Sequence, residues 1–269
     1  MAMHVRDIGS GPPLVFLHGW SCHGGFFAPQ VEALQDRFRL LLPDLPGHGQ
    51  SPAPDDLSIT GLADALHDML IQHRVERPVL IGWSMGAMVA FDYLRRHGWR
   101  GIAGLVIEDM TARISTDAGW RLGLGGGFDA AQNAATLGLM QADWKGFSAA
   151  SLPHLFARHH APDAALKHWV GAEMVKNDPA TMAALWASMA AQDFRDLLPR
   201  LDLPCLVVHG GGSQLYAPEV SEWLVATLPH ARSLCLDRSG HMPHLEQHAE
   251  FNAALAAFAA TLVAPEPAR

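Results

Sequence analysis

Six short apolar runs, rich in Val, Ile and Leu, recur along the chain. They cover residues 13–19, 38–44, 78–84, 102–109, 204–210 and 231–237. Each run is bounded by Gly, Pro or Asp, and its apolar residues are continuous rather than alternating. Continuous runs of this kind are typical of strands that are covered on both faces, so they predict a mostly parallel sheet.

Helical patterns fill most of the stretches between these runs. The predicted helices cover residues 60–74, 85–97, 217–228 and 249–263. We expect Thr60 to cap the first of them. Its apolar stripe is formed by Leu62, Leu66, Met69 and Leu70. Strands that alternate with helices predict an α/β fold with helices on both faces of the sheet.

The alternation stops between about Thr111 and Ala191, where no strand-like run occurs. This stretch is helical in pattern and rich in Ala, Met and aromatic residues. We expect residues 111–191 to be a helical lid inserted into a core made of residues 1–110 and 192–269. The alternative is a set of ordinary packing helices. The aromatic residues are Trp120, Phe128, Trp144, Phe147, Phe156, Trp169 and Trp186.

Composition narrows the classes of function. The net charge of −8 disfavours binding to nucleic acid, which needs a basic face. The three cysteines lack disulfide or Cys-x-x-Cys spacing, and no His-Glu-x-x-His occurs, so we expect no metal and no other cofactor. No signal peptide is recognisable, and no apolar run reaches about 18 residues. We therefore expect a cytoplasmic protein without a membrane span.

A Gly-x-Ser-x-Gly stretch, "GWSMG" at residues 82–86, joins the run 78–84 to the helix 85–97. A serine on such a sharp strand-to-helix turn has its hydroxyl lifted clear of the sheet, as a nucleophile needs. Ser84 is therefore the candidate nucleophile. The alternative is a tight turn in which the serine only caps the helix.

Two further motifs follow the first two runs. In "HGW", the backbone N–H of Trp20 and that of Met85 are expected to form an oxyanion hole beside Ser84. His18 is expected to be a structural, hydrogen-bonding residue. The stretch 44–51, "DLPGHGQS", predicts a tight turn rather than chemistry.

"RSGHMPHLEQ", residues 238–247, follows the last apolar run. His241 stands on the loop before the final helix, where a general base could reach Ser84. His244 and His248 are rivals, but both stand nearer to the helix or inside it.

The motifs "FLHGW", "DLPGHGQS", "GWSMG" and "SGHMPHLE" stand in an order and spacing similar to the α/β-hydrolase family, over about residues 10–263. Within it, the chain resembles small carboxylesterases near the pimeloyl-[acyl-carrier protein] methyl ester esterases, which carry a four-helix lid. The resemblance implies Ser84 as nucleophile, His241 as base, and the N–H groups of Trp20 and Met85 as oxyanion hole.

The resemblance does not decide which residue supplies the carboxylate of the implied triad. Where the family most often has "HGxxD", this chain has "HGGGS", which puts Ser213 at the acid's position. The glycines lack the Gly-Lys-Ser/Thr ending of a phosphate-binding loop. Some relatives, such as haloalkane dehalogenases, carry the acid after an earlier strand, which here ends in Glu108 and Asp109. The period of two puts these side chains on opposite faces, and we favour Asp109 over Glu108. The alternative is that Asp109 only turns the chain.

These features predict a serine hydrolase that cleaves small-molecule acyl esters through an acyl-enzyme, with preference for short to medium, uncharged acyl groups. A lactonase, a C–C bond hydrolase and a perhydrolase share the same triad and stay open. A non-catalytic binding protein with a decayed triad is the alternative from another class. Residues 111–191 hold six Lys and Arg against six Asp and Glu, so no basic surplus supports a partner as acidic as an acyl-carrier protein.

Overall fold

The computed structural model describes residues 3–263. Seven strands form one sheet in the order β1-β3-β2-β4-β5-β6-β7. Only β1 is antiparallel to its neighbour. The strands are β1 Val5–Ile8, β2 Pro13–Leu17, β3 Arg39–Pro43, β4 Val79–Trp83, β5 Gly104–Glu108, β6 Cys205–Gly210 and β7 Ala231–Leu236.

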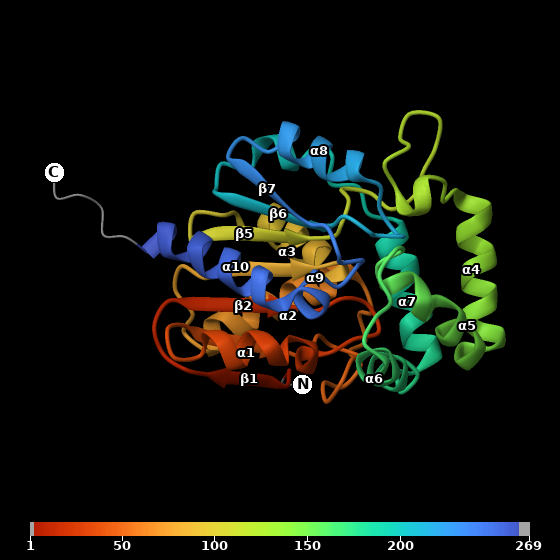
Figure 1. Ribbon diagram of the computed structural model, residues 1–269, viewed down its shortest axis with the longest axis horizontal. Helices are drawn as coiled ribbons and strands as arrows, with labels where there is room; N and C mark the ends of the chain where they lie inside the picture. The colour runs from red at the N-terminus through yellow and green to blue at the C-terminus, as the bar shows by residue number, and fades with distance from the viewer. Residues whose placement is uncertain (1–2, 264–269) are drawn as a thin grey trace, which may run out of the picture.

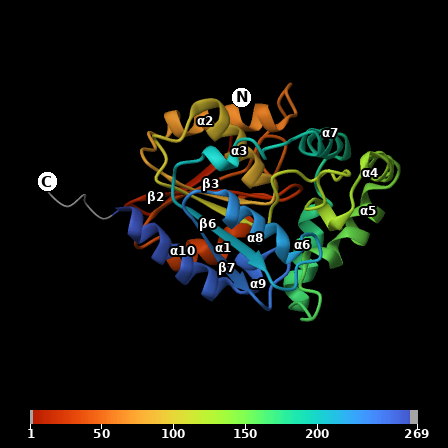
Figure 2. The same cartoon turned by 90° about the horizontal axis from the view of Figure 1, so that it is seen from above.

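Helices cover both faces of this sheet, as Figures 1 and 2 show. The core on one face includes side chains of α2, α3 and α8, and the core on the other includes side chains of α1 and α10. The six predicted strands and the mostly parallel α/β fold are thereby confirmed. The covering helices are α1 Ala28–Leu34, α2 Ile59–Gln72, α3 Met85–His97, α8 Pro218–Thr227, α9 Pro243–Glu246 and α10 His248–Val263.

Within β2 the two faces alternate by residue. Leu14 and Phe16 belong to the core under α1 and α10, whereas Val15 and Leu17 belong to the core under α2 and α3. All four are fully buried. A strand that is apolar on both faces is required where helices cover both sides, which is why the runs are continuous.

The strand β1, the short helix α1 and the four-residue helix α9 were not predicted, and one cap prediction is wrong. The edge strand β1 is the polar sequence VRDI, and the short α1 buries only Gln30 and Leu34, so neither shows a long apolar pattern. Helix α2 is capped by Ser58 instead of Thr60. The Ser58 side chain accepts a hydrogen bond from the Gly61 N–H at 3.0 Å.

Four helices stand between β5 and β6, and they are grouped beyond one end of the sheet (Figure 1). They are α4 Ala130–Ala142, α5 Trp144–Ser151, α6 Ala164–Met174 and α7 Pro179–Ala190. Short 3₁₀ turns cover Gly24–Phe27, Leu124–Gly126, Leu152–Leu155 and Leu198–Arg200. In the described part of the chain, no helix has both the length and the apolar character needed to cross a bilayer.

Candidate active site

Ser84 lies on the sharp turn between β4 and α3. Its backbone has φ 53° and ψ −120°, a region that residues other than glycine rarely enter. The Ser84 N–H donates to the carbonyl of Glu108 at 3.0 Å, which ties the turn to the end of β5. Strain of this kind is characteristic of a serine held out for chemistry on a strand–turn–helix unit.

The two glycines of the motif are required by close packing. A Cβ on Gly86 would lie 2.0 Å from the carbonyl oxygen of Leu17, and a Cβ on Gly82 would lie 2.5 Å from the Cα of Ala87. Neither space accepts a side chain, because these neighbours are backbone atoms. The Gly-x-Ser-x-Gly pattern is therefore explained by the tight approach of α3 to β2 and β4.

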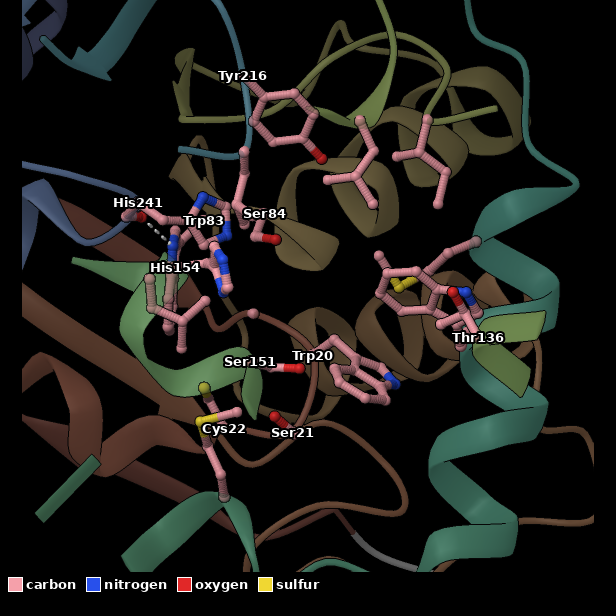
Figure 3. Close-up of a pocket in the computed structure, with 18 of the residues that line it drawn as sticks. Trp20, Ser21, Cys22, Trp83, Ser84, Thr136, Ser151, His154, Tyr216 and His241 are labelled. Atoms are coloured by element: carbon pink, nitrogen blue, oxygen red, sulfur yellow. Dashed lines mark hydrogen bonds between the residues drawn. The ribbon is translucent and has the colours of Figure 1, made fainter. Parts of the chain in front are cut away.

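His241 is buried on the loop between β7 and α9. Its carbonyl accepts a hydrogen bond from the Trp83 indole at 2.7 Å, and its N–H donates to the Leu155 carbonyl at 2.9 Å. The dashed line in Figure 3 joins Trp83 to His241. The residue before Ser84 thus holds the backbone of His241, and the two candidate catalytic residues line the same cavity.

Asp109 directly follows β5 and meets the ring of His241. The distance from His241 Nδ1 to Asp109 Oδ2 is 2.6 Å, and both side chains are almost completely buried. An ionised carboxylate only accepts hydrogen bonds, so Nδ1–H donates and the free lone pair of the ring is on Nε2. That is the tautomer which a general base needs.

Glu108 serves a different histidine. Its Oε1 accepts hydrogen bonds from the His244 N–H at 2.9 Å and from His244 Nδ1 at 2.8 Å, and both side chains are fully buried. His248 is exposed at the first position of α10. The structure therefore places Ser84 and His241 on one cavity with the Asp109 carboxylate against His241, and it pairs the Glu108 carboxylate with His244 instead.

The two candidate oxyanion donors come from α3 and from the loop after β2. Met85 is the first residue of α3, where the backbone N–H groups have no partner inside the helix. Trp20 follows Gly19, whose added Cβ would lie only 3.3 Å from the Ser84 Cβ, so this loop passes close to the serine. The Trp20 indole donates to the Met182 carbonyl of α7 at 2.9 Å.

His18 has the structural role that the sequence predicts. Its Nε2 accepts from the Leu45 N–H at 2.8 Å, and its Nδ1 donates to the Gly19 carbonyl at 2.8 Å. Burial lowers the pKa of His18 to about 3, so the ring is neutral. Its hydrogen bonds join the loop that carries Trp20 to the turn at 44–51. In that turn Asp44 accepts from the Gly24 and Gln50 N–H groups.

A cavity of about 240 Å³ lies between the strand ends and the helices of the insertion. Figure 3 shows Ser84, Trp83 and His241 together on one side of it and Thr136 of α4 on the other. Among the described residues that line it, no Lys, Arg, Asp or Glu occurs. Its apolar wall is supplied mainly by Trp20, Ile114, Leu124, Phe128, Phe147, Leu155, Met174, Trp186 and Met189.

Two residues of the site were not recognised as functional in the sequence. Ser213 donates a hydrogen bond to Asp109 Oδ2 at 2.8 Å. Glu246 accepts from the Gly240 N–H at 2.7 Å and from the Ala157 N–H at 2.9 Å, which ties the His241 loop to the insertion. Burial raises the pKa of Glu246. Both contacts depend on loop conformation. The sequence placed Ser213 at the family's usual acid position and Glu246 in the motif around His241, but neither position indicates these hydrogen bonds.

Comparison with known proteins agrees with this geometry. Residues 14–254 match the model of the alpha/beta hydrolase family. The chain belongs to this family. It is 30% identical to a pimeloyl-[acyl-carrier protein] methyl ester esterase from Chromobacterium violaceum, over 95% of this chain and 97% of that protein. A protein of the same name from Aeromonas hydrophila is also 30% identical, over 93% and 96% of the two chains.

Solved structures extend the likeness to the fold. An esterase from Exiguobacterium antarcticum has a TM-score of 0.89 at 24% identity, covering 96% of this chain and 95% of that one. A thermophilic esterase from Thermogutta terrifontis has a TM-score of 0.84 at 26% identity, with 97% and 93% covered. Together with the curated relatives, these likenesses confirm the expectation of a carboxylic ester hydrolase.

Proposed function

We propose that this protein is a serine esterase which cleaves acyl esters through a covalent acyl-enzyme, with Ser84, His241 and Asp109 as its triad. The observation that carries the proposal is the buried contact of 2.6 Å between His241 Nδ1 and Asp109 Oδ2, at a cavity that Ser84 also lines. A carboxylate at Nδ1 orients the imidazole and stabilises the imidazolium that forms in the transition state.

The chemistry follows from these positions. Ser84 Oγ attacks the ester carbonyl while His241 Nε2 takes its proton. The oxyanion that develops is stabilised by the N–H groups of Trp20 and Met85, and the positive end of the α3 dipole favours the same charge. His241 then protonates the leaving alcohol. Water, deprotonated by His241, attacks the acyl-enzyme. The acid is released as His241 returns the proton to Ser84 Oγ.

The cavity supports the substrate class. Its volume of about 240 Å³ and its wall without Lys, Arg, Asp or Glu, among the described residues, favour a short to medium, uncharged acyl group. We propose residues 111–191 as the lid that closes over this group. The names of the relatives favour a methyl ester carried on an acyl-carrier protein as a second candidate. The even charge of the lid, six residues of each sign, favours the small-molecule ester instead.

The triad also argues against a binding protein that has lost its chemistry. Such a chain has no reason to keep a strained φ of 53° at Ser84 or a buried carboxylate against His241. Lactonase, C–C hydrolase and perhydrolase activities share the same triad, and no contact in the cavity selects one of them over an open-chain ester.

Covalent labelling tests the proposal. A fluorophosphonate is expected to add a single label at Ser84, detected by mass spectrometry, and Ser84→Ala is expected to abolish release of p-nitrophenol from short acyl esters. A panel of acyl groups is expected to rank uncharged short and medium chains above charged ones by kcat/KM. A label at another residue, or hydrolysis that survives in Ser84→Ala, contradicts the mechanism. A charged ester that ranks first contradicts the substrate class.

A further inference from the structure

Ser213 and His241 share one oxygen of Asp109. Oδ2 accepts a hydrogen bond from Ser213 Oγ at 2.8 Å and from His241 Nδ1 at 2.6 Å. Ser213 stands at the position where the family most often has its acid. The hydroxyl found there is therefore in direct contact with the carboxylate that faces His241.

The direction of this hydrogen bond is set by the turn in which Ser213 lies. Its Oγ is approached by the N–H groups of Leu215 and Tyr216, each at 3.4 Å. Both groups can only donate, so the lone pairs of Ser213 Oγ face them. The proton of the hydroxyl is then free for Asp109, which as a carboxylate can only accept. Ser213 thus places a donor on the negative charge of the site.

The glycines before Ser213 allow the backbone of this turn to pack closely against the segment that carries His241. A Cβ on Gly210 would lie 2.0 Å from the carbonyl oxygen of Gly240, and the Gly212 N–H donates to the Ser239 carbonyl at 2.9 Å. The glycine run is explained by this close backbone approach. One loop is therefore in contact with Asp109 and with the residues directly before His241.

We propose that Ser213 is a positioning residue for the triad, which holds Asp109 Oδ2 in line with His241 Nδ1 and draws off part of its charge. The proposal rests on the proposed function, because Asp109 must act on His241. Three other titratable groups face this pair: His209 of β6 and Tyr216 lie close enough to interact with the charge of Asp109, and Glu246 of α9 interacts with His241.

Loss of the Ser213 hydroxyl has two expected effects. The carboxylate is held less firmly, so kcat of Ser213→Ala falls about ten-fold with little change in KM, the size that loss of one charge-assisted hydrogen bond produces. Without the hydrogen bond from Ser213, the full negative charge of the Asp109 carboxylate also stabilises the His241 imidazolium more strongly. The acid limb of kcat/KM against pH, which reports His241, therefore moves up by about half a pH unit.

Threonine separates this role from a merely structural one. Ser213→Thr keeps the hydroxyl, and its methyl group has room because Ser213 also lines a second cavity of about 290 Å³. We expect Ser213→Thr to restore both kcat and the acid limb. Ser221 supplies the matched control. Its hydroxyl donates to the Pro218 carbonyl at 2.8 Å, and Ser221→Ala is expected to leave the pH profile unchanged.

The measurement is kcat and KM from pH 5 to 9 for the wild type and the three variants, with p-nitrophenyl esters, and with folding checked by thermal unfolding. Wild-type values for Ser213→Ala overturn the positioning role. The role is also overturned if Ser213→Ala loses kcat, Ser213→Thr does not restore it, and the acid limb stays in place, because a change in packing alone explains that result. If fluorophosphonate does not label Ser84 of the wild type, it is the proposed triad that fails. If fluorophosphonate labels Ser84 of the wild type while Ser213→Ala has wild-type kcat and pH profile, only the positioning role of Ser213 is contradicted.

Discussion

Asp109 and Glu108 are adjacent in the chain, and each holds one histidine. Glu108 is the last residue of β5, Asp109 follows it with a left-handed backbone of φ 42°, and their side chains contact different partners. Asp109 meets His241 at 2.6 Å, and Glu108 meets His244 at 2.8 Å. The second pair is fully buried beneath Trp83, whose ring centre lies 4.7 Å from that of His244. We therefore assign Glu108 to packing and to the start of α9 rather than to chemistry.

The amide Asp109→Asn separates charge from shape. We expect kcat to fall by up to about 10⁴-fold, because an amide neither stabilises the imidazolium nor keeps the ring in the productive tautomer. The free energy of unfolding changes little, since the amide oxygen still accepts from Ser213. Steady-state kinetics and urea unfolding measure the two effects. Glu108→Gln is the matched control and keeps most of the activity. An inactive Glu108→Gln beside an active Asp109→Asn would show that the roles are reversed.

At the residue scale the sequence predicted the positions of Ser84, Asp109 and His241, because the first two directly follow strand ends and the third stands on the loop after the last strand. Parallel strands bring such ends to one edge of the sheet, so order along the chain is enough to group them. The contact between Ser213 and Asp109 could not be predicted from the sequence. It depends on the path of the turn 210–216, which is set by backbone contacts with residues 239 and 240.

At the scale of elements, the decisive unit is β4, the turn at Ser84 and α3. The sequence predicted its helix with the observed bounds, Met85–His97, because the Gly-x-Ser-x-Gly stretch joins a strand-like run to a helical pattern. The edge strand β1 was not predicted, because it lacks a clear pattern of apolar residues. It is short and charged, and its Asp7 pairs with Arg39 at 2.6 Å on the exposed edge.

Substitution of Gly86 tests how tightly this unit is packed. In Gly86→Ala the added Cβ lies 2.0 Å from the Leu17 carbonyl oxygen, so α3 or β2 must move. We expect the free energy of unfolding to fall by about 3 kcal/mol and kcat to fall with the displaced Ser84. Chemical denaturation and ester hydrolysis measure both.

Gly138 in the exposed part of α4 provides the control. A Cβ there meets nothing within 4 Å, so Gly138→Ala is expected to be neutral or to stabilise the helix by up to about 1 kcal/mol. Equal unfolding midpoints for Gly86→Ala and the wild type would show that the turn between β4 and α3 tolerates a side chain, and the packing explanation of the motif would then be wrong.

At the scale of the whole molecule, the site is assembled from segments far apart in the chain. The loop after β2, the end of β4, the loops after β6 and β7 and the insertion between β5 and β6 all contribute to one cavity. The order of the motifs predicted the sheet and the class of chemistry. The shape of the cavity was not predictable, because it depends on how the ring of Trp20 packs against those of Trp144 and Trp186.

Two buried histidines couple this assembly to pH. Burial lowers the pKa of His18 and of His48 to about 3, and their rings lie 5.0 Å apart. In the unfolded chain each titrates near 6.5. Between these values the unfolded state binds more protons than the folded state, so acid favours unfolding. The stability is fully present above about pH 6.5 and is lost as pH falls towards 3.

The change in the free energy of unfolding with pH tests whether His18 and His48 are neutral in the folded protein. Each histidine contributes about 1.4 kcal/mol per pH unit, so the pair gives about 2.7 kcal/mol per unit between pH 4.5 and 6. Carboxylates with lowered pKa, such as Asp7 beside Arg39, act only below about pH 4. Urea unfolding at several pH values measures the slope, and His48→Gln is expected to reduce it by about 1.4 kcal/mol per pH unit. A His48→Gln protein with the wild-type slope would show that this ring is not neutral in the folded state, and the destabilisation in acid would then have to come from other groups.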